Sequence, residues 1–483
     1  MSNLHEISPI KFGTDGWRAI IGDQFTFENV RNIGLGIGCW IQESHPSDRP
    51  VLVGYDTRFL SPEFAEVLAT TFVSMGIPVL MSSDFLPTPT LAWSVSRHGA
   101  AAGVMVTASH NPAIYNGIKV RLSSGAAAQV SDTDSILKFY NASLAQELDK
   151  QLVNTGNEEL LSKVDFVGKY LNHIEAQVDI DLIRAAGLRV LVDSMHGAAS
   201  RLLSAVVNGG KTVVIDQRAD VNPGFPDMRA PEPIAANLAK TMEMITGSGG
   251  NEFDCGFAFD GDGDRMGLID ERGDFISALD TFSLLVHSSL EVRSEVGPVV
   301  RSLTMSKLVD KIARSCGQKV FETRVGFKHL APVMTEEDAV LAGEESGGTA
   351  FRGHVCERDG LLSALRVLEL IAIKNKGPRT LLDGLMIEHG QHRYKRIDFP
   401  FDTKAQTDIY QHLINAVPKT LGGRRVVDTD QMDGFRYHLE DGWWVSVRES
   451  GTEPLVRVYA EMETDSEVDF AIAEVARLLG LDQ

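Results

Sequence analysis

A strand-and-helix pattern that recurs three times along the chain restricts the folds open to it more than any other feature. Each block opens with a short apolar run and ends with a second run that enters a polar, glycine-containing loop. The opening runs are residues 51–56, 189–193 and 298–301, and the closing runs are residues 103–107, 255–259 and 339–342. Helix-like stretches lie between them, for example residues 61–68, where a serine and a proline suit a first helical turn. Strands that alternate with helices predict layered α/β domains, in which ligands gather at the loops after strands.

The pattern changes after about residue 390. Residues 443–448 and 455–459 alternate apolar and polar side chains like half-buried strands, with a glycine-containing loop between them. These features predict a smaller α+β domain at the C-terminal end. A chain of 483 residues is also too long for one ordinary core. We therefore predict three similar α/β domains and a fourth, smaller one, with the bounds 1–156, 157–276, 277–390 and 391–483.

Residues 260–265 read Asp-Gly-Asp-Gly-Asp-Arg, which places three carboxylates at alternate positions, Asp260, Asp262 and Asp264, ahead of Arg265. Carboxylate oxygens suit hard divalent cations such as Mg²⁺, and the glycines let the backbone turn tightly. We interpret the loop as a metal site that takes a further oxygen from a substrate or a phosphate. A solvated acidic turn is the alternative, but three unpaired aspartates would repel one another. An EF-hand is disfavoured because arginine occupies position six, where that loop needs glycine, and because a strand-like run precedes it.

The net charge is −20 and no basic run occurs, which argues against nucleic-acid and membrane partners. No apolar run approaches the roughly 20 residues that span a bilayer, and the first residues lack a signal-peptide pattern, so we expect a cytoplasmic protein. The four cysteines are widely separated, which suggests neither disulfides nor a thiolate zinc site. A small anionic substrate is compatible with this charge, and it makes each arginine in a glycine-containing loop informative. Nothing in the sequence indicates a particular oligomeric state.

Two loops in the first domain carry further candidate groups. In residues 11–18, two glycines flank Thr14 and Arg18 follows, which suits a phosphate, although an ordinary N-terminal turn fits equally well. In residues 107–112, Ser109 follows a strand and can act as a nucleophile. An Asn-Pro turn with incidental hydroxyls is the alternative, because no G-x-S-x-G motif surrounds the serine. Lys119 is close enough in sequence to reach the same loop as an acid, a base or a phosphate partner, or it is a solvated charge.

Two later loops suit a sugar phosphate. Residues 343–348 place carboxylate and hydroxyl side chains on a flexible turn, which suits sugar hydroxyls, although the same residue types favour plain solvent loops. Residues 448–454 combine arginine, serine, glycine and threonine, with Arg457 beyond, and predict an anion site. Neither a P-loop nor a dinucleotide fingerprint occurs. A metal site, a serine and phosphate loops without a nucleotide site indicate transfer of a phosphoryl group already present on the enzyme or the substrate.

Taken together and in this order, the five loops resemble those of the α-D-phosphohexomutase family, which includes the phosphoglucomutases and phosphomannomutases. The resemblance extends from residue 12 to residue 457 and implies a heart-shaped molecule of four domains around a central cleft. It implies that Ser109 is phosphorylated and that Mg²⁺ is held by this phosphoserine together with Asp260, Asp262 and Asp264. It implies roles near the reacting group for Arg18, His110, Lys119 and Arg265. It implies substrate binding by Glu344, Ser346, Arg301, Lys328, Arg448, Ser450, Gly451, Thr452 and Arg457.

The implied reaction is a two-step transfer. Phosphoserine donates to the sugar, and the resulting glucose 1,6-bisphosphate turns over and returns its other phosphate to Ser109. Residues 301–306 and 326–328 resemble the glucose branch, and Gly348 departs from the dual glucose/mannose branch, where histidine is common. Gly263 disfavours the phosphoglucosamine branch, which tends to have alanine there. The general base is open among Arg18, His110, Lys119 and Lys328.

We therefore predict a phosphoglucomutase, an isomerase that acts on small hexose phosphates. A phosphomannomutase or a dual-specificity hexose phosphomutase is the alternative, because equatorial and axial hydroxyls at C2 differ by few contacts. More remote alternatives are a hexose bisphosphate synthase, a metal-dependent sugar phosphatase and a non-catalytic sugar-phosphate binding protein.

Overall fold

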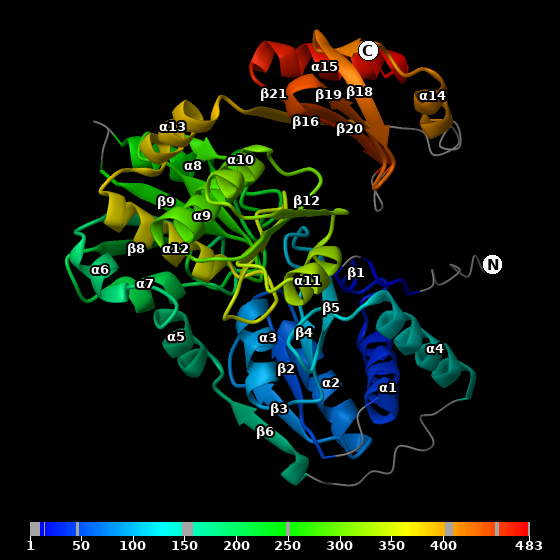
Figure 1. Ribbon diagram of the computed structural model, residues 1–483. Coiled ribbons are helices and arrows are strands. Elements are labelled where there is room, and N and C mark those ends of the chain that lie inside the picture. Colours follow the sequence, from blue (N-terminus) through cyan, green and yellow to red (C-terminus); the bar gives the residue numbers. More distant parts are fainter. Residues whose placement is uncertain are drawn as a thin grey trace.

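The computed structural model describes residues 10–13, 15–44, 48–146, 158–247, 252–400, 409–449 and 454–481. Four separate sheets carry the fold, and helices pack against each of them (Figure 1). The chain therefore has the predicted architecture of three α/β units and a smaller C-terminal one. No helix within these ranges is long and apolar enough to cross a membrane.

The first sheet has the strand order β1-β5-β4-β2-β3-β6 and carries helices on both faces. Val51 and Val53 of β2 join the core that α1, α2 and α4 cover, whereas Leu52 joins the core under α3. Such alternation follows from the two-residue period of a strand, and burial on both faces explains why this strand is apolar throughout. The elements are β1 (Trp17–Ile20), α1 (Phe27–Ser44), β2 (Val51–Tyr55), α2 (Ser61–Ser74), β3 (Val79–Ser82), α3 (Thr88–Arg97), β4 (Ala102–Val106), β5 (Tyr115–Leu122), α4 (Val130–Gln146), the short 3₁₀ helix η2 (Glu158–Leu160) and β6 (Leu161–Val164).

One strand of this sheet lies beyond the predicted end of the first domain. β6 pairs in parallel with β3, from Leu161 opposite Val79 to Val164 opposite Ser82. The chain thus returns to the first sheet after residue 156 before it enters the second unit. The bounds near 156, 276 and 390 stay predictions.

The second sheet has the order β11-β10-β9-β7-β8 and the third the order β13-β12-β14-β15. The second unit contains α5 (Val167–Glu175), α6 (Ile180–Ala185), β7 (Arg189–Asp193), α7 (Leu202–Val207), β8 (Val213–Gln217), α8 (Ala235–Thr246), β9 (Cys255–Phe259), β10 (Met266–Ile269) and β11 (Phe275–Ile276). The third contains α9 (Ala278–His287), the π-helix η3 (Ser288–Val292), β12 (Val299–Ser302), α10 (Leu308–Ser315), β13 (Val320–Thr323), α11 (Phe327–Glu336), β14 (Leu341–Gly343), β15 (Thr349–Phe351), α12 (Gly360–Lys374) and α13 (Pro378–His389).

The three α/β sheets share one pairing scheme, which confirms the repeat predicted from the sequence. In each, the strand of the opening run (β2, β7 or β12) pairs in parallel with two neighbours. The strand of the closing run (β4, β9 or β14) is one of those neighbours, and it pairs antiparallel with the next strand of the chain. The loops predicted to bind ligands follow β4, β9 and β14, so they occupy equivalent positions in the three units.

The second and third units share one continuous core. α12 contacts α6, α7, β9 and β10 of the second unit as well as α9 of its own. Its side chains Leu361, Leu365 and Leu368 are buried in the same cluster as Phe257 and Phe259 of β9. The second and third units are therefore joined through a shared core.

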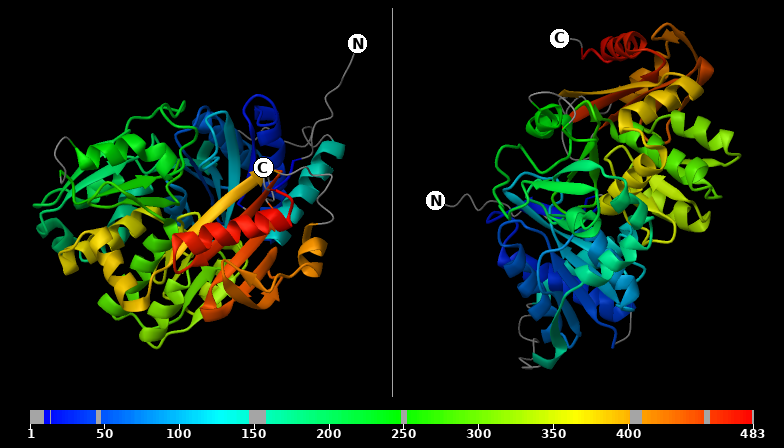
Figure 2. Two further views of the ribbon diagram at one scale, coloured as in Figure 1. Left: turned by 90° about the horizontal axis from the view of Figure 1, so that it is seen from above. Right: turned by 90° about the vertical axis from the view of Figure 1, so that its left-hand side faces the viewer.

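The fourth unit is an antiparallel sheet with the order β16-β21-β20-β19-β18-β17. Figure 1 and the right-hand view of Figure 2 show this unit, coloured orange to red, standing at one end of the molecule. Helix α15 begins with a capping box between Thr464 and Glu467 and packs on β16 and β21. The elements are β16 (Arg393–Pro400), α14 (Ile409–Asn415), β17 (Thr420–Leu421), β18 (Arg424–Asp430), β19 (Phe435–Leu439), the 3₁₀ turn η5 (Glu440–Gly442), β20 (Trp444–Glu449), β21 (Leu455–Met462) and α15 (Asp465–Leu478).

Candidate active site

The loops that follow β4 and β9 meet directly. The Ser109 hydroxyl donates to Asp260 Oδ2 at 2.8 Å, although the two residues are 151 positions apart in the chain. A Cβ atom on Gly261 would lie 2.4 Å from the carbonyl oxygen of Ser109, so only glycine lets the two loops approach this closely. The structure thus places the predicted nucleophile against the first predicted metal ligand.

Ser109 adopts an unusual backbone conformation. Its φ of +49° lies in the left-handed region, which residues other than glycine rarely adopt. The Ser109 N–H donates to Thr107 Oγ1 at 2.9 Å, and the Thr107 hydroxyl donates to Asp56 Oδ2 at 2.6 Å. The Ser61 hydroxyl donates to the other oxygen of Asp56 at 2.8 Å. This chain of hydrogen bonds is anchored on a buried carboxylate. It holds the turn that directs the Ser109 side chain toward residues 260–265, the predicted metal loop.

Arg58 secures the same turn from the other side. Its guanidinium donates to the carbonyl oxygens of Ser109 (2.6 Å), Asn111 (2.5 Å), Pro112 (2.9 Å) and Tyr115 (3.0 Å). The sequence analysis did not single out this arginine or Asp56. The available signal was a pair of charged residues directly after a fully buried strand, since buried charges require partners.

The three aspartates of the metal loop are fully buried, and one oxygen from each lies within 4.8 Å of the others. Both oxygens of Asp260 accept hydrogen bonds, from Ser109 Oγ and from the backbone N–H of Arg265. By contrast, Asp262 Oδ1 and Asp264 Oδ1 have no hydrogen-bond partner among the described residues. Buried carboxylate oxygens without a donor are costly unless a cation satisfies them. The donor set therefore fits a hard divalent cation.

The protonation of these aspartates supports the same conclusion. Burial raises the pKa of Asp260 well above its ordinary value, and the nearby carboxylates Asp264 and Asp262 add to the rise. Burial also raises the pKa of Asp262, but the ammonium of Lys119 outweighs it, and the net shift is downward. The protein's own cations thus compensate part of the charge on the loop, and a bound cation would let Asp260 ionise as well.

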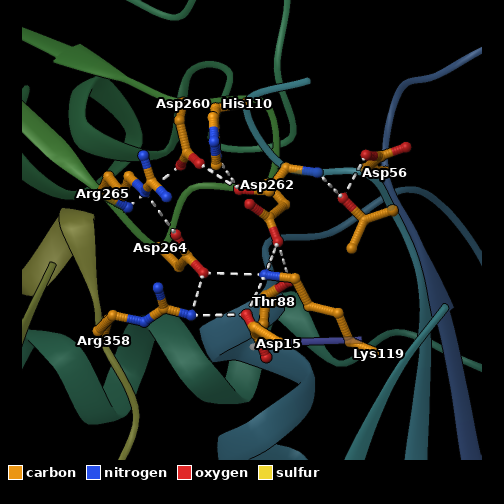
Figure 3. A network of polar contacts seen from close by, with 12 residues as sticks. Asp15, Asp56, Thr88, His110, Lys119, Asp260, Asp262, Asp264, Arg265 and Arg358 are labelled. Atoms are coloured by element: carbon orange, nitrogen blue, oxygen red, sulfur yellow. Dashed lines mark hydrogen bonds and ion pairs between the residues drawn. The ribbon is translucent and has the colours of Figure 1, made fainter. Parts of the chain in front are cut away.

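Two cations lie on the outer side of the metal loop (Figure 3). Lys119 Nζ is 2.7 Å from Asp262 Oδ2 and 2.9 Å from Asp264 Oδ2. Arg358, which the sequence analysis did not predict, places a guanidinium nitrogen 2.8 Å from Asp264 Oδ2. Burial alone would lower the pKa of Lys119, but the surrounding carboxylates outweigh this and raise it above its ordinary value. Lys119 is therefore a charged ammonium at neutral pH.

The other residues predicted near the reacting group also gather here. The Arg18 guanidinium donates to the side-chain oxygen of Asn111 at 2.7 Å, in the turn that carries Ser109. Arg265 lies 3.4 Å from Glu232 and 3.9 Å from Asp264. His110 Nδ1 lies 3.3 Å from Ser109 Oγ, and burial, with Arg265 and Arg18 nearby, lowers the pKa of this histidine well below its ordinary value. The imidazole is therefore neutral at neutral pH.

The sugar-binding loop predicted after β14 borders this centre. The Ser346 hydroxyl donates to Glu344 Oε1 at 2.7 Å, and the same oxygen lies 3.2 Å from the Arg358 guanidinium. Arg358 thus connects the predicted sugar loop to the metal loop. Lys328, on α11, lines a small cavity of about 20 Å³ together with Phe12 and others of the N-terminal loop. It therefore lies across the junction between the third and first units.

The remaining predicted substrate residues lie farther along the chain. Arg301 is buried and pairs with Asp310 and Glu322 at 2.8 Å each, so its charge is already balanced, and its assignment to substrate stays a prediction. Arg448 lies 2.9 Å from Asp433. The predicted phosphate loop continues through residues that lie outside the described ranges, Ser450, Gly451 and Thr452, and Thr14 of the N-terminal loop lies outside them as well. Arg457 pairs with Asp398 at 3.6 Å.

Comparison with known protein families agrees with this arrangement. Residues 9–147 match the model of phosphoglucomutase/phosphomannomutase, alpha/beta/alpha domain I, residues 168–273 that of domain II and residues 280–389 that of domain III. Residues 404–478 match the C-terminal domain of the same family. The chain belongs to the phosphoglucomutase/phosphomannomutase family. It is accordingly a phosphohexomutase, an isomerase that transfers a phosphoryl group, as the sequence predicted.

Relatives of this phosphohexomutase carry several substrate names. A "Phosphoglucomutase/phosphomannomutase" from Thermococcus kodakarensis is 31% identical over 454 residues, which cover 94% of this chain and 95% of the relative. A "Probable phosphoglucosamine mutase" from Methanothermobacter thermautotrophicus is 33% identical over 471 residues, 97% of each chain. The crystal structure of a phosphoglucomutase/phosphomannomutase family protein from Burkholderia thailandensis superposes with a TM-score of 0.80 at 22% identity, over 96% of each chain. The last likeness concerns the fold alone.

Proposed function

We propose that this phosphohexomutase is a phosphoglucomutase, which interconverts glucose 1-phosphate and glucose 6-phosphate through a phosphoserine and glucose 1,6-bisphosphate. The contact of 2.8 Å between Ser109 Oγ and Asp260, beside two buried carboxylate oxygens without donors among the described residues, carries the phosphoserine and metal part of the proposal. A serine in such a place can hold a phosphoryl group whose oxygen completes a divalent-metal site.

We assign Mg²⁺ as the cation, held by Asp260, Asp262, Asp264 and an oxygen of phosphorylated Ser109. Bound there, it would neutralise charge on the transferring phosphoryl group. In the first step the Oγ–P bond of phosphoserine breaks and a bond from a sugar hydroxyl oxygen to phosphorus forms. The proton of that hydroxyl needs an acceptor, and we assign this role to His110 because its Nδ1 lies 3.3 Å from Ser109 Oγ. Charged Lys119, by contrast, is suited to stabilise negative charge on the phosphoryl group.

The choice of glucose over mannose is supported by Gly348, because the dual-specificity branch commonly carries histidine at this place. A Cβ atom there would lie 2.3 Å from Cδ and 2.7 Å from Cγ of Arg358, so the histidine that the dual-specificity branch commonly carries does not fit beside this arginine. Gly263 adopts a φ of +69°, where an alanine would be strained, and a Cβ atom would lie 3.1 Å from side-chain atoms of Ala199 and Pro87. This disfavours the alanine typical of the phosphoglucosamine branch.

Phosphoglucosamine mutase is the second candidate, because a relative that covers nearly all of this chain bears that name. Phosphomannomutase activity follows as a third, since one changed hydroxyl alters few contacts. The three activities predict the same phosphoserine and the same metal loop. Only the sugar accepted at residues 343–348 distinguishes them.

A coupled assay tests the proposal. Purified protein is given glucose 1-phosphate, mannose 1-phosphate or glucosamine 1-phosphate with Mg²⁺, with and without glucose 1,6-bisphosphate. We expect the highest kcat/KM with glucose 1-phosphate and no net release of phosphate. Dominant turnover of glucosamine 1-phosphate would contradict the choice of sugar, phosphate release would indicate a phosphatase, and accumulation of bisphosphate a bisphosphate synthase.

Intact-mass measurement tests the nucleophile. We expect one phosphate on the wild-type protein after incubation with glucose 1,6-bisphosphate, and loss of both the phosphate and turnover in Ser109→Ala. The exposed Ser96, whose hydroxyl donates to the carbonyl oxygen of Trp93 in its own helix, gives the matched control Ser96→Ala, which should retain both. Full turnover in Ser109→Ala would refute the role of the serine, and absence of turnover with every sugar phosphate would indicate a binding protein.

A further inference from the structure

Asp15 lies in the active site, although the sequence analysis did not predict a role for it. It lies in the N-terminal loop before β1, and three cations converge on its carboxylate. Lys119 Nζ lies 2.8 Å from it, a guanidinium nitrogen of Arg358 lies 2.7 Å away and one of Arg121 lies 3.0 Å away. Lys119 and Arg121 belong to β5 of the first unit, whereas Arg358 precedes α12 of the third. Asp15 therefore gathers buried charges from two units.

Two of these cations also contact the metal loop. Lys119 lies between Asp15 on one side and the Oδ2 atoms of Asp262 and Asp264 on the other, at 2.7–2.9 Å. Arg358 bridges Asp15 and Asp264 Oδ2 in the same way, at 2.7 and 2.8 Å. Figure 3 shows this layered order, with Asp15 on the far side of both cations from the aspartate loop.

The layering separates the two oxygens of Asp262 and of Asp264. Their Oδ2 atoms face Lys119 and, for Asp264, also Arg358, whereas Arg265 is 3.9 Å from Asp264 Oδ1. Thr88 adds a hydroxyl hydrogen bond of 2.5 Å to Asp262 Oδ2. The Oδ1 atoms of Asp262 and Asp264 have no hydrogen-bond partner among the described residues. The orientation of both carboxylates therefore depends on where Lys119 and Arg358 are held.

We propose that Asp15 is a positioning residue for the metal centre. It shares Lys119 and Arg358 with the loop, keeps them from settling fully on the outer oxygens of Asp262 and Asp264, and thereby sets the affinity of the loop for a divalent cation. The proposal rests on the proposed use of such a cation. Asp15 is not one of the three clustered carboxylates and acts through the two cations.

The physical reason is the sharing of charge. With Asp15 present, the Lys119 ammonium divides its attraction among three carboxylates, only two of which belong to the metal loop. Without the negative charge of Asp15, Lys119 and Arg358 would lose a buried partner and settle more fully on Asp262 and Asp264. The two carboxylates would then be neutralised by the protein's own cations and would bind an added cation less tightly.

The test measures Mg²⁺ affinity on the full-length, dephosphorylated protein by isothermal titration calorimetry, which needs no turnover. Residues behind the ligands typically contribute about 10- to 100-fold to metal affinity, so we expect Asp15→Asn to weaken Mg²⁺ binding by that factor. Asp15→Glu keeps the carboxylate and should recover most of the affinity. Asp15→Ser serves as the charge-removing variant if asparagine impairs folding. Unchanged Mg²⁺ affinity in a folded charge-removing variant overturns the proposal.

Glu232→Gln provides the matched control, because it removes one negative charge on another side of the same loop. Glu232 lies 3.4 Å from Arg265, and among the ion pairs of the described residues it has none with Lys119 or Arg358. If Asp15 acted only through the general field, both variants would weaken Mg²⁺ binding equally, and that result would overturn a positioning role. A double-mutant cycle gives a second criterion. The effect of Asp15→Asn should shrink in an Arg358→Met background, whereas additivity within about twofold would contradict transmission through Arg358.

These outcomes are distinguishable from failure of the proposed function. The choice of sugar does not enter the measurement, and a protein that binds Mg²⁺ but isomerises glucosamine phosphate would leave the role of Asp15 intact. A wild-type protein that binds no Mg²⁺ in either its phosphorylated or its dephosphorylated form would refute both.

Discussion

Replacement of Arg58 by lysine tests how the turn that carries Ser109 is held. Arg58 uses two guanidinium nitrogens to reach four carbonyl oxygens, those of Ser109, Asn111, Pro112 and Tyr115, at 2.5–3.0 Å. Lysine keeps the positive charge but offers a single nitrogen, so it cannot span the same set.

The magnitude follows from the bonds that are lost. If lysine retains two of the four, the loss of two charge-assisted hydrogen bonds at about 1.5–3 kcal/mol each amounts to about 3–6 kcal/mol of local stability. The left-handed backbone of Ser109 stores about 1–3 kcal/mol of strain, which the intact grip of Arg58 outweighs. With half the grip removed, we expect the turn to relax and Ser109 to move away from Asp260. A misplacement of about 1 Å at a reacting group costs roughly 100-fold in rate, so kcat of Arg58→Lys should fall by about that factor.

Turnover of glucose 1-phosphate in the coupled assay measures kcat, and hydrogen exchange of residues 108–117 reports opening of the turn. Circular dichroism and thermal unfolding verify that the rest of the protein is folded. The control is Arg49→Lys, because Arg49 is exposed and donates through Nε to one carbonyl oxygen, that of Gly99, at 2.9 Å. The reasoning is refuted if folded Arg58→Lys keeps kcat within about threefold of the wild type, a difference of only about 0.6 kcal/mol.

Three further predictions concern groups outside the metal loop. Burial raises the pKa of Glu461, but hydrogen bonds, first that from His392, outweigh it and the net pKa is below its ordinary 4.5. The stabilisation by the Glu461 carboxylate is therefore present above pH 4.5 and is lost as the pH falls through the lowered pKa. The melting temperatures of wild type and Glu461→Gln should differ at pH 7 and converge in acid, and a difference that does not change with pH would contradict this. Burial lowers the pKa of His173 from 6.5 to about 4, so the unfolded chain binds more protons between these values and stability falls as pH drops from 6.5 to 4. His173→Gln should reduce the dependence of the melting temperature on pH between 4 and 6.5. An unchanged pH dependence would argue against a lowered pKa of His173. Asp433→Asn should raise KM for hexose phosphate about fivefold with little change in kcat. Arg448 of the predicted phosphate loop loses its charged partner at 2.9 Å and is then held less well for the substrate. An unchanged KM in steady-state kinetics would count against this.

Much of the fold and the centre of the site could be predicted from the sequence because the signals are local. The opening runs form β2, β7 and β12, and the closing runs form β4, β9 and β14. Apolar runs of this length, bounded by turn residues, suit strands buried on both faces. The place of strand β6 could not be predicted in this way. Residues 161–164 pair with β3, about 80 positions earlier in the chain, and no local pattern indicates which sheet a strand joins.

The residues missed in the site share a different property. Arg58 acts on a turn about 50 residues away, and Arg358 pairs with Asp15 across 343 residues. Each is an ordinary charged residue within its own segment. The sequence likewise did not indicate the partners of Arg301, Asp310 and Glu322, and its assignment to the substrate stays a prediction.

By itself, the sequence determined the α/β repeat, the aspartate loop and Ser109, since the geometry of each depends on residues a few positions apart and on the backbone between them. Only the tertiary structure decided that Ser109 touches Asp260 and that Lys119 and Arg358 lie between Asp15 and the metal loop. The physical reason is that a buried ion pair forms only where the packed sheets bring distant segments within a few ångströms, and the identity of a charged residue carries no information about which segment that will be.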